Sequence, residues 1–321
     1  MKAIDITVIM VSYNTEALLP LALNALQRAA KAVTLQVIIV DNASRDGSVE
    51  LIRRDFPECE LIVNQQNVGF GRANNQALEL VRGRYVLLLN TDAFVAPDTL
   101  RKTLTYMDAH PRCGVLGVRL VGRDGEVQPS ALNFMTPWAL FLNRTGWHRF
   151  FPWVRPVDDP QRDTAQVQKC DWVPGCYYLI RKRLIDEVGL FDPRYFLYSE
   201  EVDHCFAAKK AGWDVIYFPE TTVVHLGGES ARSSGPLSRH KQLEALQIES
   251  ELLFFRKNNG MPAVIGNLLL VTLANLIDLL KCLLKHLLKK RQHVTIPALI
   301  DHTRLAWSLF WRTRCGLRPT R

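Results

Sequence analysis

Apolar and polar positions alternate in blocks along the first third of the chain. Four runs rich in β-branched residues have the length of strands, and they cover residues 6–13, 36–41, 60–64 and 85–90. Between them lie segments whose apolar residues recur every three or four positions, at 17–30, 48–56 and 71–81. Strands that alternate with helices in this way predict a mostly parallel sheet covered by helices.

A further helix is expected at 98–110, because Pro97 stands where a first helical turn begins. The region is therefore predicted to be a doubly wound α/β unit, and such sheets bind their ligands beyond the carboxyl ends of the strands. The residues at these strand ends are Ser12, Tyr13, Asn14, Asp41, Asn42, Asn64, Asn90, Thr91 and Asp92.

The character of the chain changes at residues 131–172, which are rich in Pro and aromatic residues and have little periodicity. We expect a long loop or insertion there, near a binding surface. Patterned segments return at 173–192, 199–213 and 214–228, and they predict a second set of strands and helices.

The tail from Pro262 to Leu288 is almost entirely apolar and is long enough to span a bilayer. Its polar residues fall in one stripe of a helix, namely Asn267, Asn275, Asp278, Lys281, Lys285 and Lys289. A charge near the bilayer centre costs at least ~2.5 kcal/mol. We therefore favour a helix that lies in the membrane interface, with the stripe wet and the lysines directed at anionic lipid, over a span or a buried core helix.

Charge is concentrated in the same tail. Residues 238–321 hold 14 Lys and Arg against 5 Asp and Glu, whereas the remaining residues hold 26 against 27. This pattern predicts a basic, membrane-associating appendage at 238–321 after a domain at 1–237, and no nucleic-acid surface. Seven scattered cysteines without a CxxC pair are typical of a reducing compartment, and the amino terminus lacks the features of a secretory signal.

Glycine-rich motifs for nucleotide phosphates are incomplete. Residues 67–78 contain Gly69-x-Gly71 before a predicted helix, but Asn74 occupies the third glycine position of a dinucleotide fingerprint. The sequence also contains no GxxxxGK[ST] motif. Two interpretations of this stretch stay open, a glycine-permitted helix entry capped by Asn67 or Asn64 and a ligand contact.

Carboxylates stand at two strand ends. Asp41 opens the turn DNASRDGS, where it fits either an ordinary turn or an acceptor for a base N–H group. Asp92 ends the segment NTDA, where it fits either a polar strand end or a ligand for a divalent cation. One carboxylate suffices for a cation that bridges phosphates, because phosphate oxygens and water complete its shell.

Two later motifs carry candidate chemistry. Glu200, Glu201 and Asp203 open a predicted helix, where they either favour the helix dipole or supply a general base toward a hydroxyl group. His225 ends an apolar run before a glycine-rich loop at 226–230, so it is either a structural histidine or a functional residue beside a mobile flap.

Taken in order, these motifs resemble the family 2 glycosyltransferases with the GT-A fold, particularly the subgroup with bacterial rhamnosyltransferases. The resemblance covers residues 5–235 and rests on VSYN, DNASRDGS, NVGFGRANN, LLNTDA, VPGCYYLIRK, GLFDPRYFLYSEEVD and VVHLGGES. It implies an inverting transfer of a sugar from a nucleoside diphosphate, best matched by L-rhamnose from dTDP-rhamnose, onto a hydroxyl of a lipid-linked or polysaccharide acceptor in cell-envelope glycan synthesis.

The resemblance also implies roles for particular residues. Asp41 would hold the pyrimidine base, Asp92 and His225 would bind Mg²⁺ or Mn²⁺ against the diphosphate, and Glu201 would be the catalytic base, with Glu200 as the alternative. The implied donor site consists of Val11, Ser12, Tyr13, Asp41, Asn67, Gly69, Arg72, Asn74, Thr91 and Asp92. Trp172 and Gly175 are assigned to the acceptor side or to a loop.

Two departures from the family pattern matter. The Asp-x-Asp motif is Asn90-Thr91-Asp92, and the usual Glu-Asp pair is Glu200-Glu201. Alternatives are a UDP-sugar donor, a catalytically idle nucleotide-binding scaffold, and an NAD-dependent enzyme suggested only by Gly69-x-Gly71. The expected location is the cytoplasmic face of the bacterial inner membrane, as a peripheral protein on an anionic surface.

Overall fold

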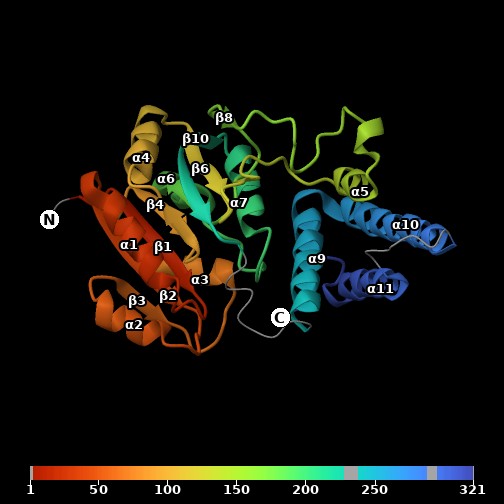
Figure 1. Ribbon diagram of the computed structural model, residues 1–321, viewed down its shortest axis with the longest axis horizontal. Coiled ribbons are helices and arrows are strands. Elements are labelled where there is room, and N and C mark those ends of the chain that lie inside the picture. The colour runs from red at the N-terminus through yellow and green to blue at the C-terminus, as the bar shows by residue number, and fades with distance from the viewer. Residues whose placement is uncertain (1–2, 228–237, 288–294, 321) are drawn as a thin grey trace. The chain divides into compact units, whose positions relative to one another are not determined.

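The computed structural model describes residues 3–227, 238–287 and 295–320 (Figure 1). The chain divides into two compact units. Unit 1 comprises Met1–Leu132 and Pro160–Pro236, and unit 2 comprises Asn133–Asp159 and Leu237–Arg321. Unit 2 thus joins the tail that begins near residue 238 to part of the aromatic-rich stretch. All seven cysteines carry free thiols.

Unit 1 is built on one sheet in the order β3-β2-β1-β4-β9-β6-β10-β5, with β7 paired to β6 and β8 to β10. Its first four strands are β1 (Ile6–Ser12), β2 (Leu35–Asp41), β3 (Glu60–Val63) and β4 (Tyr85–Leu89). These strands are parallel, as predicted, and Ser12 is level with Asp41 in the register of β1 and β2. The neighbouring carboxyl ends of β1 and β2 therefore meet at one edge of the sheet.

Beyond β4 the sheet is mixed. The remaining strands are β5 (Ala93–Val95), β6 (Cys113–Val121), β7 (Val127–Gln128), β8 (Gln168–Lys169), β9 (Tyr177–Arg181) and β10 (Asp214–His225). Strand β9 is antiparallel to both of its neighbours, β4 and β6, whereas β10 runs parallel to β6. The antiparallel β9 brings the residues just before it beside the carboxyl end of β4.

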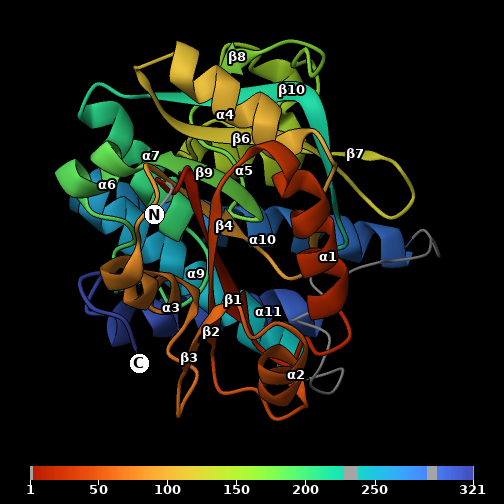
Figure 2. The same cartoon turned by 90° about the vertical axis from the view of Figure 1, so that its left-hand side faces the viewer.

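Helices cover both faces of this sheet (Figure 2). Helices α1 (Leu19–Ala29), α2 (Ser48–Asp55) and α4 (Thr99–Ala109) share one core with Ile6, Val8 and Met10 of β1. Helices α3 (Phe70–Gln76), α6 (Lys182–Val188) and α7 (Glu200–Lys210) belong to the other face. On that face the Tyr178 hydroxyl lies 2.8 Å from His204 Nδ1 of α7. Short 3₁₀ turns follow α1 at Ala30–Ala32 and α3 at Ala77–Leu80.

Unit 2 is helical. It contains α5 (Pro137–Thr145), a 3₁₀ turn (Trp147–Phe150), α9 (Ser238–Asn258), α10 (Gly260–Leu287) and α11 (Ile296–Arg312). The stretch 131–172, expected as a long loop or insertion, contains helix α5, whose ends carry strong local signals. Thr136 accepts a hydrogen bond from Ala139 N at 3.1 Å, Pro137 starts the helix, and Gly146 ends it with φ 74°.

The helical tail is confirmed, but its polar stripe is wet only in part, because Lys281 is exposed and Asp278 is half-buried whereas the two asparagines are buried. Asn267 and Asn275 of α10 are 4% and 3% exposed. Arg144 of α5 bonds Asn275 and lies 3.9 Å from Asp278, so these groups face other helices of unit 2. Of the remaining stripe residues, the Lys285 side chain and Lys289 lie outside the described residues. By length and composition, one described helix could cross a membrane, over Gly260–Leu284.

Candidate active site

The ends of β1 and β2 present a buried carboxylate. Asp41, the last residue of β2, is 1% exposed, and its Oδ1 accepts a hydrogen bond from Ser44 N at 3.0 Å. Its Oδ2 has no hydrogen-bond partner among the described residues. Buried polar atoms are normally paired. An unpaired carboxylate oxygen at a strand end can therefore accept a hydrogen bond from a ligand.

The end of the first strand, β1, lies beside Asp41 at this edge of the sheet. Ser12 is fully buried and its hydroxyl lies 3.1 Å from Thr15 Oγ1, while Val11 and Tyr13 are half-buried. Asn14 and Ala43 directly beyond the two strands have positive φ values of 54° and 68°. Non-glycine residues rarely adopt this conformation, and such strain is concentrated at functional sites.

Asn42 ties the second strand to the loop before α3. Its Nδ2 donates to Asn67 Oδ1 at 2.9 Å, and its Oδ1 accepts from Val68 N at 3.0 Å. Asn67 Oδ1 also accepts from Gly69 N at 2.9 Å. Asn67 thus shapes the loop, and no described side chain caps α3, so the interpretation of Asn67 or Asn64 as a helix cap is wrong.

Gly69 allows another chain segment to approach closely. Its φ is 90°, and a Cβ placed on it would lie 2.5 Å from the carbonyl oxygen of Phe196. Arg72 Nε donates to the Pro193 carbonyl at 2.7 Å, and Asn74 Nδ2 donates to Phe70 O at 2.9 Å. Gly69 and Arg72 therefore contact the loop that leads into α7, whereas the Asn74 side chain bonds within α3.

Asp92 and His225 are brought together by the pairing of β5 with β10. His225 pairs with Ala93, and Leu226 N donates to Asp92 O at 3.0 Å. His225 Nε2 lies 3.6 Å from Asp92 Oδ1. Asp92 is 4% exposed and its neighbour Thr91 is 2% exposed. Two residues 133 positions apart, predicted as one site, thus face each other.

Gln128 orients this histidine, and its role was not anticipated. Gln128 Nε2 donates to the His225 carbonyl at 3.0 Å, which leaves Gln128 Oε1 at 2.9 Å from His225 Nδ1. An amide oxygen only accepts, so His225 Nδ1 is the donor in this contact, and Nε2 faces Asp92 and presents a lone pair to it whenever Nε2 carries no proton. A lone pair and a carboxylate oxygen that face each other favour a cation between them.

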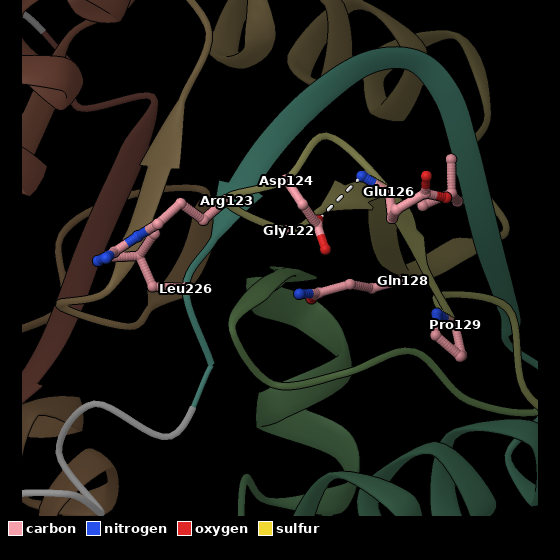
Figure 3. A pocket seen from close by; sticks show the side chains of 8 residues that line it. Gly122, Arg123, Asp124, Glu126, Gln128, Pro129 and Leu226 are labelled. Atoms are coloured by element: carbon pink, nitrogen blue, oxygen red, sulfur yellow. Dashed lines mark hydrogen bonds between the residues drawn. The ribbon is translucent and has the colours of Figure 1, made fainter.

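A hollow of about 480 Å³ lies beside this pair, at the hairpin between β6 and β7. Figure 3 shows its lining, which includes Gln128 and Leu226, the two residues that contact His225 and Asp92. Asp124 accepts a hydrogen bond from Glu126 N at 3.1 Å and so stiffens the hairpin. Asp41 and Glu201 are not part of this lining.

Protein ligands for a metal would be few here. Within residues 3–227, 238–287 and 295–320, no group of three or more His, Cys, Asp and Glu residues could hold a metal ion. Asp92 and His225 would supply two ligands. A divalent cation bound to a diphosphate draws further oxygens from the phosphates and from water, so the pair fits that kind of ion. The glycine-rich flap expected after His225 lies outside the described residues from Gly228 onward.

Two adjacent glutamates open α7 after a strained turn. Tyr198 and Ser199 have φ values of 71° and 66°, a conformation that costs ordinary residues of order 1–3 kcal/mol each. Glu200 is 4% exposed, and its Oε2 has no hydrogen-bond partner in the described part of the chain. Burial first, and the charge of Glu201 second, raise the pKa of Glu200 well above its usual value. The neutral form of Glu200 is therefore favoured relative to that of an exposed glutamate.

Glu201 has a different environment. Burial raises its pKa to about 6, against the lowering effect of backbone N–H groups, one of which belongs to Gly175. Gly175 precedes Cys176, whose carbonyl accepts a hydrogen bond from Asn90 N at 3.1 Å. The chain before β9 therefore connects the base candidate to the Asn90–Asp92 segment. Trp172 anchors this chain through two backbone hydrogen bonds of 3.1 Å with Leu132.

Comparisons with known proteins identify relatives of this chain by sequence. A family model described as "Glycosyl transferase family 2" matches residues 7–189. The chain is 28% identical over 219 residues to N-acetylglucosaminyl-diphospho-decaprenol L-rhamnosyltransferase of Mycobacterium tuberculosis, a match that covers 63% of this chain and 68% of that protein. It is 26% identical to rhamnosyltransferase WbbL of Escherichia coli, over 51% of this chain and 63% of that protein.

Solved structures share the fold at low sequence identity. The mannosyltransferase PcManGT from Pyrobaculum calidifontis, in complex with GDP-Man and Mn²⁺, matches with a TM-score of 0.54 and 17% identity, over 97% of this chain and 86% of that one. TarS of S. aureus matches with a TM-score of 0.50 and 15% identity, over 97% and 92%. The fold is thus GT-A, and the chain belongs to glycosyl transferase family 2 and is a glycosyltransferase.

Proposed function

We propose that this glycosyltransferase moves a sugar, with inversion, from a nucleoside diphosphate to a hydroxyl group of a lipid-linked or polysaccharide acceptor. The proposal rests on three groups, two of which lie at the ends of strands and one at the start of helix α7. They are a buried carboxylate with a free oxygen at Asp41, the facing pair Asp92 and His225, and an ionisable glutamate at Glu201. Each group meets one requirement of the reaction.

The donor nucleotide is assigned to the end of β2. Asp41 Oδ2 would accept the imide N–H of a pyrimidine base, because it has no other donor among the described residues. Val11, Ser12 and Tyr13 would lie beside the base. Thymine and uracil present the same N–H group, so this contact favours neither. The relatives named as rhamnosyltransferases favour dTDP-L-rhamnose as donor, with a UDP-sugar as the alternative.

The diphosphate is assigned to Asp92 and His225. These residues would hold Mg²⁺ or Mn²⁺, which supplies Lewis acidity toward the leaving diphosphate when bound. Gln128 keeps the His225 Nε2 lone pair available for coordination. Asn90 takes the place of a second carboxylate, so in this site the diphosphate oxygens would complete the coordination shell.

Glu201 is proposed as the base that accepts the acceptor hydroxyl proton. A general base must be ionised at the working pH. The pKa of Glu201 is raised to about 6, which leaves it largely a carboxylate at neutral pH, whereas burial raises the pKa of the more buried Glu200 well above its usual value. Of the two adjacent glutamates, Glu201 therefore has the protonation state that the role requires.

The acceptor is proposed to be membrane-borne. The relative from M. tuberculosis is named for a diphospho-decaprenol substrate, and the basic, helical tail of this chain fits an anionic surface. Work at the cytoplasmic face of the inner membrane, in cell-envelope glycan synthesis, follows from such an acceptor. Gly175, whose backbone N–H bonds Glu201, and Trp172 three residues before it are proposed to border its path.

The proposal is tested with purified protein and a panel of dTDP- and UDP-sugars, with Mn²⁺, Mg²⁺ or chelator. We expect release of nucleoside diphosphate that depends on metal and is fastest with dTDP-L-rhamnose. Asp92→Ala should abolish the metal dependence together with most of the activity. Nucleotide binding by calorimetry without turnover on any donor or acceptor would instead support an idle scaffold.

A further inference from the structure

Helix α10 buries polar residues and exposes leucines. Asn267 and Asn275 are almost fully buried, whereas one series of large aliphatic side chains is 43–60% exposed. This series consists of Ile265, Leu269, Leu273, Leu276, Leu280, Leu283 and Leu284. Its members follow one another at steps of mostly three and four residues, so they form one face of the helix, which we call the leucine face. A helix of a water-soluble bundle has the reverse arrangement.

Polar contacts on the opposite side fix this orientation. Asn275 Nδ2 donates to Thr303 Oγ1 of α11 at 2.7 Å, and Asn275 also receives a hydrogen bond from Arg144 of α5. Lys281 lies 3.2 Å from Asp278 and donates to Thr145 O at 3.4 Å. A rotation of α10 that buried the leucines would break these bonds within unit 2. The leucine face is therefore held outward.

Helix α11 extends the leucine face sideways. Trp307 Nε1 donates to Thr272 Oγ1 at 3.1 Å, and Thr272 lies one turn from both Leu269 and Leu276 on α10. Trp307 and Trp311 are 36% and 68% exposed, and they share a helical line with Ile300 and the exposed Arg304. Aliphatic residues bordered by Trp and Arg are typical of surfaces that sit at a membrane interface.

Charge favours a lipid occupant of this face over a second protein chain. Residues 238–321 carry 14 Lys and Arg against 5 Asp and Glu, so two copies would repel each other. Four arginines of α11 and the segment after it are exposed, namely Arg304, Arg312, Arg314 and Arg318. Anionic headgroups attract such residues at the edge of an inserted apolar face.

The neighbours of α10 determine how it would lie. Helices α5, α9 and α11 all pack against α10, and α9 carries exposed or partly exposed charged residues, namely Lys241, Glu244 and Lys257. A spanning α10 would take these helices into the hydrocarbon, where exposed charges are costly. An α10 parallel to the membrane plane keeps them on the aqueous side, above the leucine face.

We propose that unit 2 docks on an anionic bilayer with α10 in the membrane plane, the leucine face buried among acyl chains and the Trp307 edge at the headgroups. This inference deepens the membrane location in the proposed function and rests on it for its setting. The docking itself needs neither donor, acceptor nor metal.

The docking test is flotation of the full chain with vesicles of phosphatidylcholine and phosphatidylglycerol, compared with phosphatidylcholine alone. The test variant combines Leu269→Gln, Leu276→Gln and Leu280→Gln. The control combines Leu21→Gln and Leu80→Gln, which changes exposed leucines of unit 1. We expect the test variant to lose at least about tenfold in partition onto anionic vesicles, and the control to match the wild type. Equal partition of the test variant and the wild type would overturn the proposal.

Three further measurements keep the result unambiguous. Thermal unfolding should match between variants, because all the changed side chains are exposed. Alkaline carbonate should release the bound wild type, whereas resistance to release would contradict an in-plane helix. Sedimentation should show that the wild type is not a dimer held together by the leucine face. A wild-type dimer that is lost in the test variant, together with no binding to vesicles, would mean that a second copy of the chain covers this face. If the wild type fails to bind vesicles but still turns over the donor in a metal-dependent way, the docking proposal is overturned and the proposed sugar transfer is not affected.

Discussion

Gln128 holds His225 at two points, the backbone carbonyl and the imidazole Nδ1, at 3.0 and 2.9 Å. Because the amide nitrogen donates to the backbone carbonyl, the amide oxygen is the atom that accepts from the imidazole ring. A residue on a two-residue strand, β7, thereby sets the tautomer of a proposed metal ligand on the long strand β10. Partners of this kind commonly change metal affinity by about 10–100-fold when they are removed.

The first prediction concerns this contact. Gln128→Leu should weaken Mn²⁺ binding by at least about tenfold, measured by electron paramagnetic resonance in the presence of dTDP. Arg123→Gln is the matched control, since Arg123 lines the same hollow and is exposed. Unchanged Mn²⁺ affinity in Gln128→Leu would show that the tautomer of His225 does not matter for the metal.

The second prediction concerns the donor base. In Asp41→Asn, one side-chain oxygen can still accept from Ser44 N, but an NH₂ group replaces the free oxygen and faces the imide N–H. Loss of a hydrogen bond to a charged acceptor costs about 1.5–3 kcal/mol. Calorimetry should therefore show a similar loss of affinity for dTDP and UDP, with the exposed Asp55→Asn as control. A loss for only one of the two nucleotides would argue against imide recognition.

The third prediction concerns Gly69. Gly69→Ala places a Cβ against the Phe196 carbonyl in a left-handed conformation, so the free energy of unfolding should fall by about 1–3 kcal/mol. Gly266→Ala, in the middle of α10 with open space around it, should instead stabilise the protein by up to about 1 kcal/mol. Urea unfolding measures both variants. Equal stability of the two would contradict the close approach at Gly69.

The fourth prediction concerns pH and Glu251 of α9. Burial raises the pKa of Glu251 to about 7, so the folded state prefers the protonated form. The associated stability is present at acid pH and is lost as pH rises through about 7. Glu251→Gln should therefore gain about 1–3 kcal/mol over the wild type at pH 8, with the gain shrinking strongly by pH 5 and vanishing below the unfolded pKa of 4.5. Denaturant titrations at both pH values test this, and a pH-independent difference would contradict it.

Much of unit 1 could be predicted from its sequence. Buried strands such as β1 and β4 are mostly apolar runs, and polar residues mark where they stop, with Ser12 at the end of β1 and Asn90 directly after β4. The proximity of Asp92 and His225 required the family resemblance, because β5 and β10 are distant in sequence. The role of Gln128 could not be predicted, since a two-residue strand leaves no periodic signal and the contact depends on long-range pairing.

The tail shows a different limit. Periodicity correctly located the polar stripe of α10, but it cannot tell which side of a helix other helices will cover. The hydrogen bonds of Arg144 and Thr303 with Asn275 decide that question. Strand β9 shows a similar limit, because its apolar pattern is compatible with either a parallel or an antiparallel neighbour and does not determine its direction.

The central claim is that Glu201, and not Glu200, accepts the proton of the acceptor hydroxyl. The most direct measurement is the rate of sugar transfer against pH for the wild type, Glu201→Gln and Glu200→Gln. The wild-type rate should fall as pH drops through about 6, where Glu201 becomes protonated. Glu201→Gln should lose about 10²–10⁴-fold while it still binds donor and metal, and Glu200→Gln should keep most of its activity and the same pH midpoint. Full activity in Glu201→Gln, or the large loss in Glu200→Gln instead, would contradict the account.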